Sequence, residues 1–158
     1  MLSFAYAGLR AAPWVPTNKK DVARFLDLAE IKAGDKVYDL GCGDGRLLFP
    51  AAEKGAQVAG YEIFLLPYLI AKWKQYFFTQ KKQTKIVYKD FWHVNLADAD
   101  IVYFFLMPKV YNKLKTKFEK ELKPGTKIIS YVWPIEGWTP LRVSESHKAQ
   151  KIYLYIKQ

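Results

Sequence analysis

Short apolar runs and amphipathic stretches alternate along the chain, and turn residues separate them. An unbroken apolar run, as at 99–106, is typical of a strand buried on both faces of a parallel sheet. Apolar residues at helical spacing indicate a helix with one buried face, as after Thr17 or Asn18, either of which offers a capping oxygen. The pattern further predicts strands at 36–40, 57–63, 85–89, 99–106 and 126–133 and helices at 46–54, 65–80 and 109–122.

The order of these elements predicts one α/β domain. Strand and helix alternate five times, which is typical of a mostly parallel, Rossmann-like central sheet with helices on both faces. Two further strands, at 141–146 and 151–156, are close enough in sequence to pair as an antiparallel C-terminal unit. A length of 158 residues fits a single domain. We place that domain at 18–158, after an extended N-terminal segment at 1–17.

The composition excludes several classes of protein. A single cysteine, Cys42, excludes a disulfide-stabilised secreted scaffold and a cysteine-based zinc finger, and it fits a reducing compartment. His93 and His147 lack the partner spacing of a metal site, so no metal is expected. The net charge of +10 comes almost wholly from lysine. This favours a solvated basic surface over a nucleic-acid groove, in which arginine is the better ligand for phosphate.

No apolar stretch reaches the roughly 18 residues that a membrane-spanning helix needs. The nearest candidate, 2–15, is shorter and contains Arg10. Three interpretations of it stay open: a frayed terminus, a remnant of a longer anchor, and a segment that lies on a membrane surface. We therefore expect a cytoplasmic protein, with membrane association through residues 1–15 as the alternative.

The strongest chemical signal follows the first predicted strand, where a helix is preceded by the glycine-rich sequence Asp39-Leu40-Gly41-Cys42-Gly43-Asp44-Gly45. Glycines let a ligand approach the backbone closely. Their G-x-G-x-G spacing differs from the G-x-G-x-x-G of dinucleotide sites. A carboxylate at Asp39 repels a pyrophosphate but pairs with an ammonium group. The loop therefore suits the amino-acid end of a ligand, the alternative being that its glycines only make a turn.

Acidic residues also stand at the ends of the next two predicted strands. Glu62 can accept hydrogen bonds from both hydroxyls of a ribose. Asp90 can accept one from an exocyclic amine while Phe91 stacks on a purine. Together with the loop, these residues describe a site for a nucleoside that carries an amino acid, at the carboxyl edge of the sheet. The alternatives are a solvated acid at Glu62, a turn former or helix cap at Asp90, and a helix cap at Thr17.

These motifs resemble those of class I S-adenosylmethionine-dependent methyltransferases, with the glycine-rich sequence as the first motif, Glu62 as the ribose acid and Asp90-Phe91 as the adenine motif. Within that superfamily the chain is most similar to the small protein-lysine N-methyltransferases that act on the ATP synthase c-subunit and the adenine nucleotide translocase. The likeness covers roughly residues 14–140 and rests on Val15-Pro16-Thr17, Val37 to Arg46, Gly60-Tyr61-Glu62, Asp90-Phe91-Trp92 with Val94-Asn95, and Trp138-Thr139-Pro140.

The resemblance implies a class I methyltransferase fold, S-adenosyl-L-methionine as cofactor, and methyl transfer to a protein lysine by in-line displacement. It implies that the cofactor is bound by Thr17, Asp39, Gly41, Cys42, Gly43, Glu62, Ile63, Asp90 and Phe91. The implied partner is a protein substrate, in particular a small membrane protein. Two features depart from the family pattern: Cys42 stands where relatives usually have serine, and the sequence lacks the long N-terminal membrane segment of the eukaryotic members.

A lysine substrate must attack as a neutral amine, and a dry aromatic channel lowers the pKa of its ammonium group. We expect that channel to contain Trp92, Leu106, Met107, Pro108, Trp133 and Trp138. No side chain stands out as a general base. Because residues alternate across a strand, two of the three neighbours Tyr103, Phe104 and Phe105 are expected to pack in the core.

Other functions are compatible with the same motifs. One is an RNA methyltransferase whose lysines follow the phosphates, and another is a module that binds the cofactor without catalysis. Many amino-directed nucleic-acid methyltransferases carry Asn-Pro-Pro-Tyr or Asp-Pro-Pro-Tyr where this chain has Phe105-Leu106-Met107-Pro108. That difference favours a protein substrate over a base. A nicotinamide-dependent oxidoreductase is disfavoured by the glycine spacing.

Overall fold

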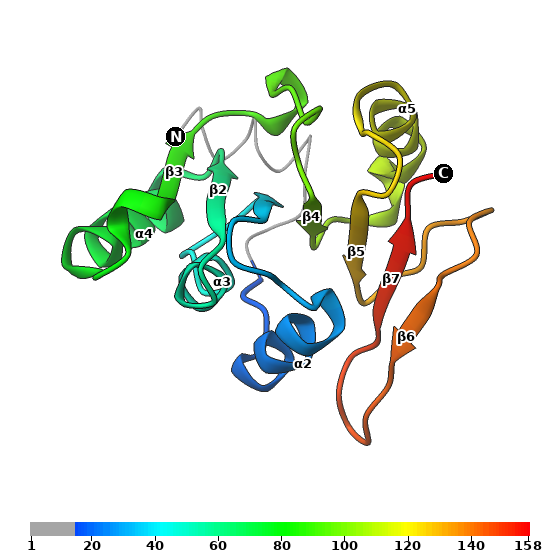
Figure 1. The fold of residues 1–158 in the computed structure, drawn as a ribbon, viewed down its shortest axis with the longest axis horizontal. Coiled ribbons are helices and arrows are strands. Elements are labelled where there is room, and N and C mark those ends of the chain that lie inside the picture. The colour runs from blue at the N-terminus through cyan, green and yellow to red at the C-terminus, as the bar shows by residue number, and fades with distance from the viewer. Residues whose placement is uncertain (1–14) are drawn as a thin grey trace.

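The computed structural model describes residues 15–158, so most of the expected N-terminal segment, 1–14, lies outside the described residues. Seven strands form one sheet in the order β3-β2-β1-β4-β5-β7-β6 (Figure 1). The first five are parallel, whereas β7 runs antiparallel to both β5 and β6. The strands are β1 (Lys36–Leu40), β2 (Gln57–Glu62), β3 (Thr84–Tyr88), β4 (Ile101–Phe104), β5 (Lys127–Tyr131), β6 (Arg142–Ser144) and β7 (Ile152–Ile156). This confirms the predicted mostly parallel sheet with an antiparallel C-terminal strand.

Helices cover both faces of the sheet, as predicted (Figure 1). The helices α2 (Lys19–Ala29), α3 (Leu48–Glu53) and α4 (Leu65–Phe77) lie on one face, and α5 (Tyr111–Glu121) lies on the other. Three short 3-10 helices complete the structure: η1 (Lys81–Gln83), η2 (Phe91–His93) and η3 (Pro108–Val110). Within the described residues, no helix has both the length and the apolar character needed to cross a bilayer.

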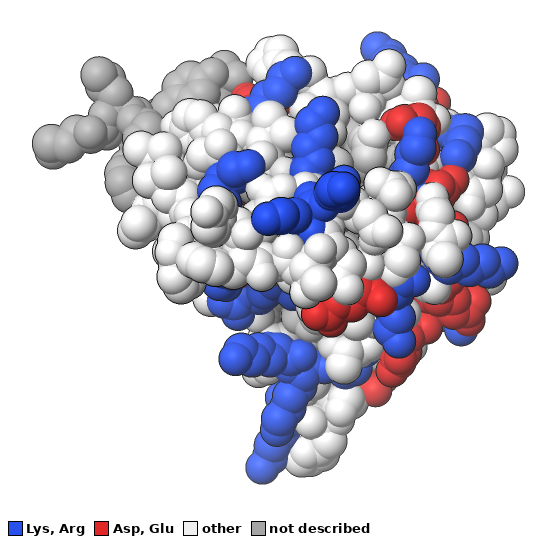
Figure 2. All heavy atoms as spheres, turned by 60° about the vertical axis from the view of Figure 1, so that its left-hand side comes forward, with Lys and Arg blue, Asp and Glu red and all other residues white. Residues whose placement is uncertain are grey.

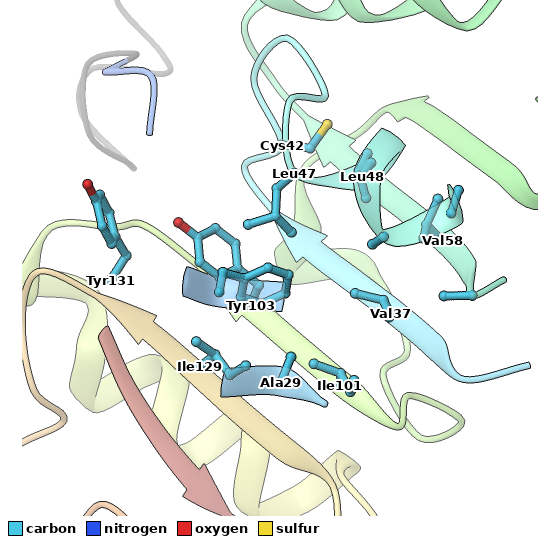
Figure 3. Packing of buried hydrophobic residues seen from close by; sticks show 14 of the residues in the cluster. Ala29, Val37, Cys42, Leu47, Leu48, Val58, Ile101, Tyr103, Ile129 and Tyr131 are labelled. Carbon is cyan, nitrogen blue, oxygen red and sulfur yellow. The ribbon is translucent and has the colours of Figure 1, made fainter. Parts of the chain in front are cut away.

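The alternation of side chains along each strand divides the core into two clusters. On the α2–α3 face, Val37 of β1, Tyr103 of β4 and Ile129 of β5 pack together (Figure 3). On the α5 face, Leu40 and Phe104 of the same strands pack against α5. The sheet is therefore buried on both sides, which explains why its central strands are apolar at nearly every position.

Several predicted boundaries were wrong by a few residues, and the backbone explains the differences. The helix predicted at 46–54 begins at Leu48, because Gly45 adopts a φ of +77° and a turn precedes the helix. The helix predicted at 65–80 ends at Phe77, since Phe78 is extended. The strand predicted at 126–133 ends at Tyr131, where Val132 turns the chain with a φ of +76°. Strand β4 covers only the centre of the predicted 99–106.

Candidate functional site

The glycine-rich loop connects the carboxyl end of β1 to α3. Gly41 and Gly43 have φ values of +92° and +54°, which L-residues with a Cβ rarely adopt. The backbone N–H groups of Gly41 and Cys42 donate to the carbonyl oxygen of Tyr61 on β2, at 2.9 and 3.1 Å. The Cys42 side chain is buried in the α2–α3 cluster (Figure 3), so this residue offers the site only its backbone. Burial also raises the pKa of its thiol.

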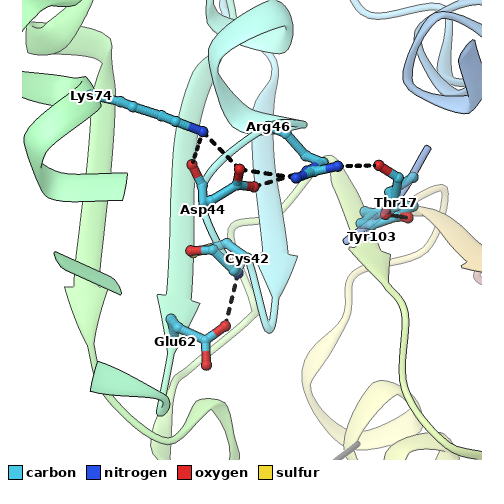
Figure 4. Close-up of polar contacts among 8 residues, drawn as sticks. Thr17, Cys42, Asp44, Arg46, Glu62, Lys74 and Tyr103 are labelled. Carbon is cyan, nitrogen blue, oxygen red and sulfur yellow. Dashed lines mark hydrogen bonds and ion pairs between the residues drawn. The ribbon is translucent and has the colours of Figure 1, made fainter. Parts of the chain in front are cut away.

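Glu62, the last residue of β2, holds this loop in place. Its Oε2 accepts from the N–H of Gly43 at 2.8 Å (Figure 4), and its Oε1 accepts from the N–H groups of Ile63 and Phe64 at 2.8 and 2.7 Å. Only 4% of the residue is exposed. Burial raises the pKa of the carboxyl group, although these three hydrogen bonds oppose the shift. Glu62 is therefore a fixed part of the site and not a solvated strand-end acid.

Asp39 is the least compensated acid of the site. It is 3% exposed, and its Oδ1 has no hydrogen-bond partner among the described residues. Burial, with the nearby charges of Glu62 and Asp44, raises its pKa well above the usual value. Asp44 differs, because Arg46 and Lys74 pair with it at 2.9 and 2.7 Å (Figure 4). Burial alone raises the pKa of Asp44, but these hydrogen bonds outweigh it and lower the pKa to about 2.

A small cavity separates the loop from the chain that precedes α2. Its volume is about 40 Å³, room for one small polar group. Thr17 lines it opposite Asp39, and the Thr17 hydroxyl hydrogen-bonds the Tyr103 hydroxyl at 3.1 Å. Thr17 is not the helix cap, because Asn18 fills that position and accepts from the N–H of Lys20. An uncompensated carboxylate facing a polar cavity is a site for a cationic group.

The predicted adenine motif lies at the carboxyl end of the neighbouring strand. The N–H of Lys89 donates to the carbonyl oxygen of Glu62 at 3.0 Å, which holds the ends of β2 and β3 together. Asp90 caps η2, and its Oδ1 accepts from the N–H of Trp92 at 3.1 Å. Phe91 is buried in the α5-side cluster, with its ring centroid 4.7 Å from that of Trp92. The sequence-predicted residues of the three strand ends thus share one edge of the sheet.

The structure does not bring the three tryptophans of the expected channel together. Trp133 lies near the loop, but Trp92 lines a separate hollow with His93 and Asn95, and Lys113 lies 4.2 Å above its ring. Trp138 packs on Tyr155, in a third hollow. The reason is the path of the chain after β5, which crosses the α5-covered face of the sheet. Of the other expected residues, Leu106 is buried, Met107 is partly exposed and Pro108 begins η3.

A cleft of about 850 Å³ adjoins the small cavity and shares Phe105 with it. The Phe105 ring is stacked with that of Trp133, their centroids 5.8 Å apart, and it meets Tyr131 edge to face at 4.8 Å. Tyr103 and Phe104 are buried, so two of the three aromatic neighbours do pack in the core. The third, Phe105, joins the cleft because it follows the last residue of β4.

Buried charge beside this cleft was missed by sequence reasoning. Asp21 is 2% exposed; Arg24 pairs with it at 2.8 Å, and the hydroxyl of Tyr131 donates to it. Arg24 also donates to carbonyl oxygens of Ser144 and Gln150, which ties α2 to the segment between β6 and β7. The only sequence signal is an acid followed by an arginine three positions later in a helix, which is common on solvated surfaces.

Comparison with known proteins gives a consistent picture. The model of the ANTKMT methyltransferase domain matches residues 39–142. A protein-lysine N-methyltransferase of Saccharolobus islandicus is 37% identical over 151 residues, covering 91% of this chain and 92% of that protein. The adenine nucleotide translocase lysine N-methyltransferase of Mus musculus is 34% identical over 134 residues, and the match covers 83% of this chain. The same match covers only 57% of the mouse protein, so the chain spans little more than half of that relative's length.

A solved structure is similar over nearly its whole length. It is described as an RNA methyltransferase from Salinibacter ruber in complex with S-adenosyl-L-homocysteine, with a TM-score of 0.85 and 30% sequence identity. The match covers 90% of this chain and 93% of that one. A methyltransferase from Geobacter sulfurreducens, also with S-adenosyl-L-homocysteine, has a TM-score of 0.66 at 18% identity and shows likeness of fold alone.

Proposed function

The chain belongs to the family of the ANTKMT methyltransferase domain, and from this premise we propose that it transfers a methyl group from S-adenosylmethionine to the side-chain amine of a protein lysine. The relatives carry the lysine part of this proposal, since the archaeal one is named a protein-lysine N-methyltransferase and covers nearly the same length. The vertebrate relatives are named for lysines of two different membrane-embedded proteins. A small membrane protein is accordingly the finer proposal for the substrate.

The residues of the loop edge fit this cofactor. When bound, S-adenosylmethionine supplies a methyl group on a positively charged sulfur. We assign the binding of its ammonium group to Asp39, whose buried Oδ1 lacks a hydrogen-bond partner among the described residues. Glu62 serves the ribose, because Oε2 accepts only one N–H bond and a carboxylate oxygen can accept two. The remaining assignments are Thr17, Gly41, Cys42, Gly43 and Ile63 around these acids and Asp90 with Phe91 at the adenine.

The observation that carries the lysine proposal is the aromatic wall of the cleft, formed by Phe105, Tyr131 and Trp133 beside the Asp39 cavity. Such a wall packs against the methylene stem of a lysine and limits its hydration. It thereby lowers the pKa of the ammonium group and favours the neutral nucleophile. The charge of Asp21 does not oppose this, because Arg24 and the Tyr131 hydroxyl already engage it. The lysine proton is lost to solvent before transfer, and the cleft then orients the amine.

Labelled S-adenosylmethionine tests this proposal when incubated with the chain and separate soluble, membrane and RNA fractions. The expected result is label in protein that survives nuclease, is removed by protease, and maps by mass spectrometry to a lysine side chain. A small protein of the membrane fraction is the expected acceptor. Label only in RNA would overturn the proposal.

The RNA alternative has one specific observation in its favour, the name of the Salinibacter ruber structure. The lysine excess of the chain would then serve phosphate binding. Against it, the cleft beside the loop holds one arginine, Arg24, and hydrogen bonds to Asp21, Ser144 and Gln150 engage its guanidinium group. Protein is therefore the substrate class we propose.

A further inference from the structure

Helix α4 turns a hydrophobic face outward. Of its thirteen residues, only Pro67 and Ala71 are buried. Trp73, Tyr76 and Phe77 are 67%, 72% and 69% exposed, and a row of leucines continues the same surface toward the start of the helix: Leu65, Leu66 and Leu69. We call these six residues the α4 stripe. Their spacing of three or four residues places most of them along one side of the helix.

The three aromatic residues of the α4 stripe pack against one another at the surface. The Phe77 ring centroid lies 5.5 Å from that of Trp73 and 5.0 Å from that of Tyr76. With about two-thirds of each ring exposed, they present on the order of 400 Å² of aromatic surface. The leucines add to this area. A patch of this size usually marks an interaction site on a protein surface.

The charge around the α4 stripe has one sign. Residues 63–89, which contain all of α4, include six lysines and no acidic residue. Lys74 pairs with Asp44, whereas Lys72, Lys81 and Lys82 are exposed, and Lys81 lies 5.6 Å from the centre of the Tyr76 ring. Figure 2, which brings this side of the molecule forward, shows lysine and arginine side chains standing among uncharged ones, with most acidic groups toward the right and below.

We propose that the α4 stripe docks the protein on an anionic lipid bilayer. An amphipathic helix with aromatic and leucine residues on one side and lysines beside them lies in the plane of a membrane interface. Its apolar side chains enter the boundary between headgroups and acyl chains, and the lysines remain at the phosphates. The α4 stripe and its lysines have this composition.

Charge and side-chain chemistry favour lipid over two other partners. A second copy of the chain would bring the lysines of both molecules together, and the net charge of +10 on each would oppose contact. RNA would use the lysines and the aromatic rings, but it would leave Leu65, Leu66 and Leu69 without an apolar partner. A bilayer satisfies the lysines, the rings and the leucines at once.

The position of α4 relates this surface to the candidate site. The helix begins three residues after Glu62, so its first turn lies at the carboxyl edge of the sheet. The lipid-binding proposal does not depend on the proposed methyl transfer. If both hold, docking through α4 keeps the loop edge close to membrane-embedded acceptors.

Co-sedimentation with lipid vesicles tests the proposal, using the full chain without cofactor. We expect binding to vesicles of three parts phosphatidylcholine and one part phosphatidylglycerol, and at least tenfold weaker binding to phosphatidylcholine alone. A Trp73→Gln/Phe77→Gln variant should bind the mixed vesicles at least tenfold less. The matched control is Leu141→Gln/Val143→Thr, which changes two exposed apolar residues elsewhere and should bind as the unchanged chain does. Circular dichroism verifies that each variant is folded.

Three results would overturn the proposal. One is equal binding by the α4 variant and the unchanged chain, which would place any membrane contact elsewhere, for example in residues 1–15. Another is a dimer at micromolar concentration that the α4 variant abolishes, which would assign the α4 stripe to a second copy. The third is binding to RNA, but not to vesicles, that the α4 variant weakens. A methyl-transfer assay on a soluble acceptor reports separately on the proposed function.

Discussion

Replacing Asp39 by asparagine should separate stability from cofactor binding. The carboxyl group is buried beside two other acids, and its Oδ1 has no hydrogen-bond partner among the described residues. Without cofactor it is therefore a cost to the fold. With cofactor, the ammonium group assigned to it supplies the missing charge. Asp39→Asn keeps the size of the side chain and removes its charge.

The two effects have opposite signs. Leaving a buried polar group without its partner costs about 1–3 kcal/mol, so the cofactor-free variant should be more stable by an amount in this range at neutral pH. Removing one partner of a buried ion pair costs about 3–5 kcal/mol, so cofactor affinity should fall by at least about a hundredfold. The matched control is Asp27→Asn, which removes the same charge from an exposed position and should change neither quantity.

The pH dependence gives a further check. Because the pKa of Asp39 is raised on folding, the folded state holds its proton where the unfolded state has lost it. The contribution of Asp39 to the stability of the unchanged chain should therefore fall as pH rises from about 4 toward the raised pKa. Asp39→Asn lacks this contribution. Urea unfolding at several pH values and calorimetric titration with S-adenosylhomocysteine measure both effects. A less stable variant, or one with unchanged affinity, would refute the reasoning.

Other predictions follow from neighbouring contacts. Glu62→Gln replaces one acceptor of backbone N–H bonds by a donor, so it should lower cofactor affinity about tenfold or more in a binding titration; equal affinity would remove Glu62 from the site. Tyr131→Phe frees the charge of Asp21 to stabilise a lysine ammonium, so the pH profile of kcat/KM should move to higher pH, and an unmoved profile would contradict the role of this contact. The ion pairs of Asp44, whose pKa is lowered to about 2, should contribute about 1–2 kcal/mol above pH 4 and lose it as pH falls toward 2. Urea unfolding of Asp44→Asn beside the unchanged chain measures this difference, which should vanish at the acidic end.

Much of the fold could be predicted from the sequence because the signals are local. Unbroken apolar runs mark strands covered on both faces, and the glycines after β1 mark a turn that only glycine adopts readily. The shared edge of Asp39, Glu62 and Asp90 follows from the parallel direction of three strands. That direction is set by the helices between them, which were predicted correctly in number and order.

The features that could not be predicted depend on contacts distant in sequence. Burial of Asp21 requires Tyr131, which comes 110 positions later. The tryptophans after β3 and β5 separate because of the path that the chain takes beyond Tyr131, where Val132 adopts an unusual backbone conformation for a β-branched residue. The apolar spacing of α4 indicates a stripe but does not say that this stripe faces away from the core.

Titration calorimetry of the unmodified chain with S-adenosylhomocysteine and, separately, with adenosine tests the central claim most directly. The account predicts one saturable site for S-adenosylhomocysteine and at least about hundredfold weaker binding of adenosine, because adenosine lacks the ammonium group that Asp39 is assigned to bind. Equal affinity for the two molecules, or no saturable binding of either, would contradict it.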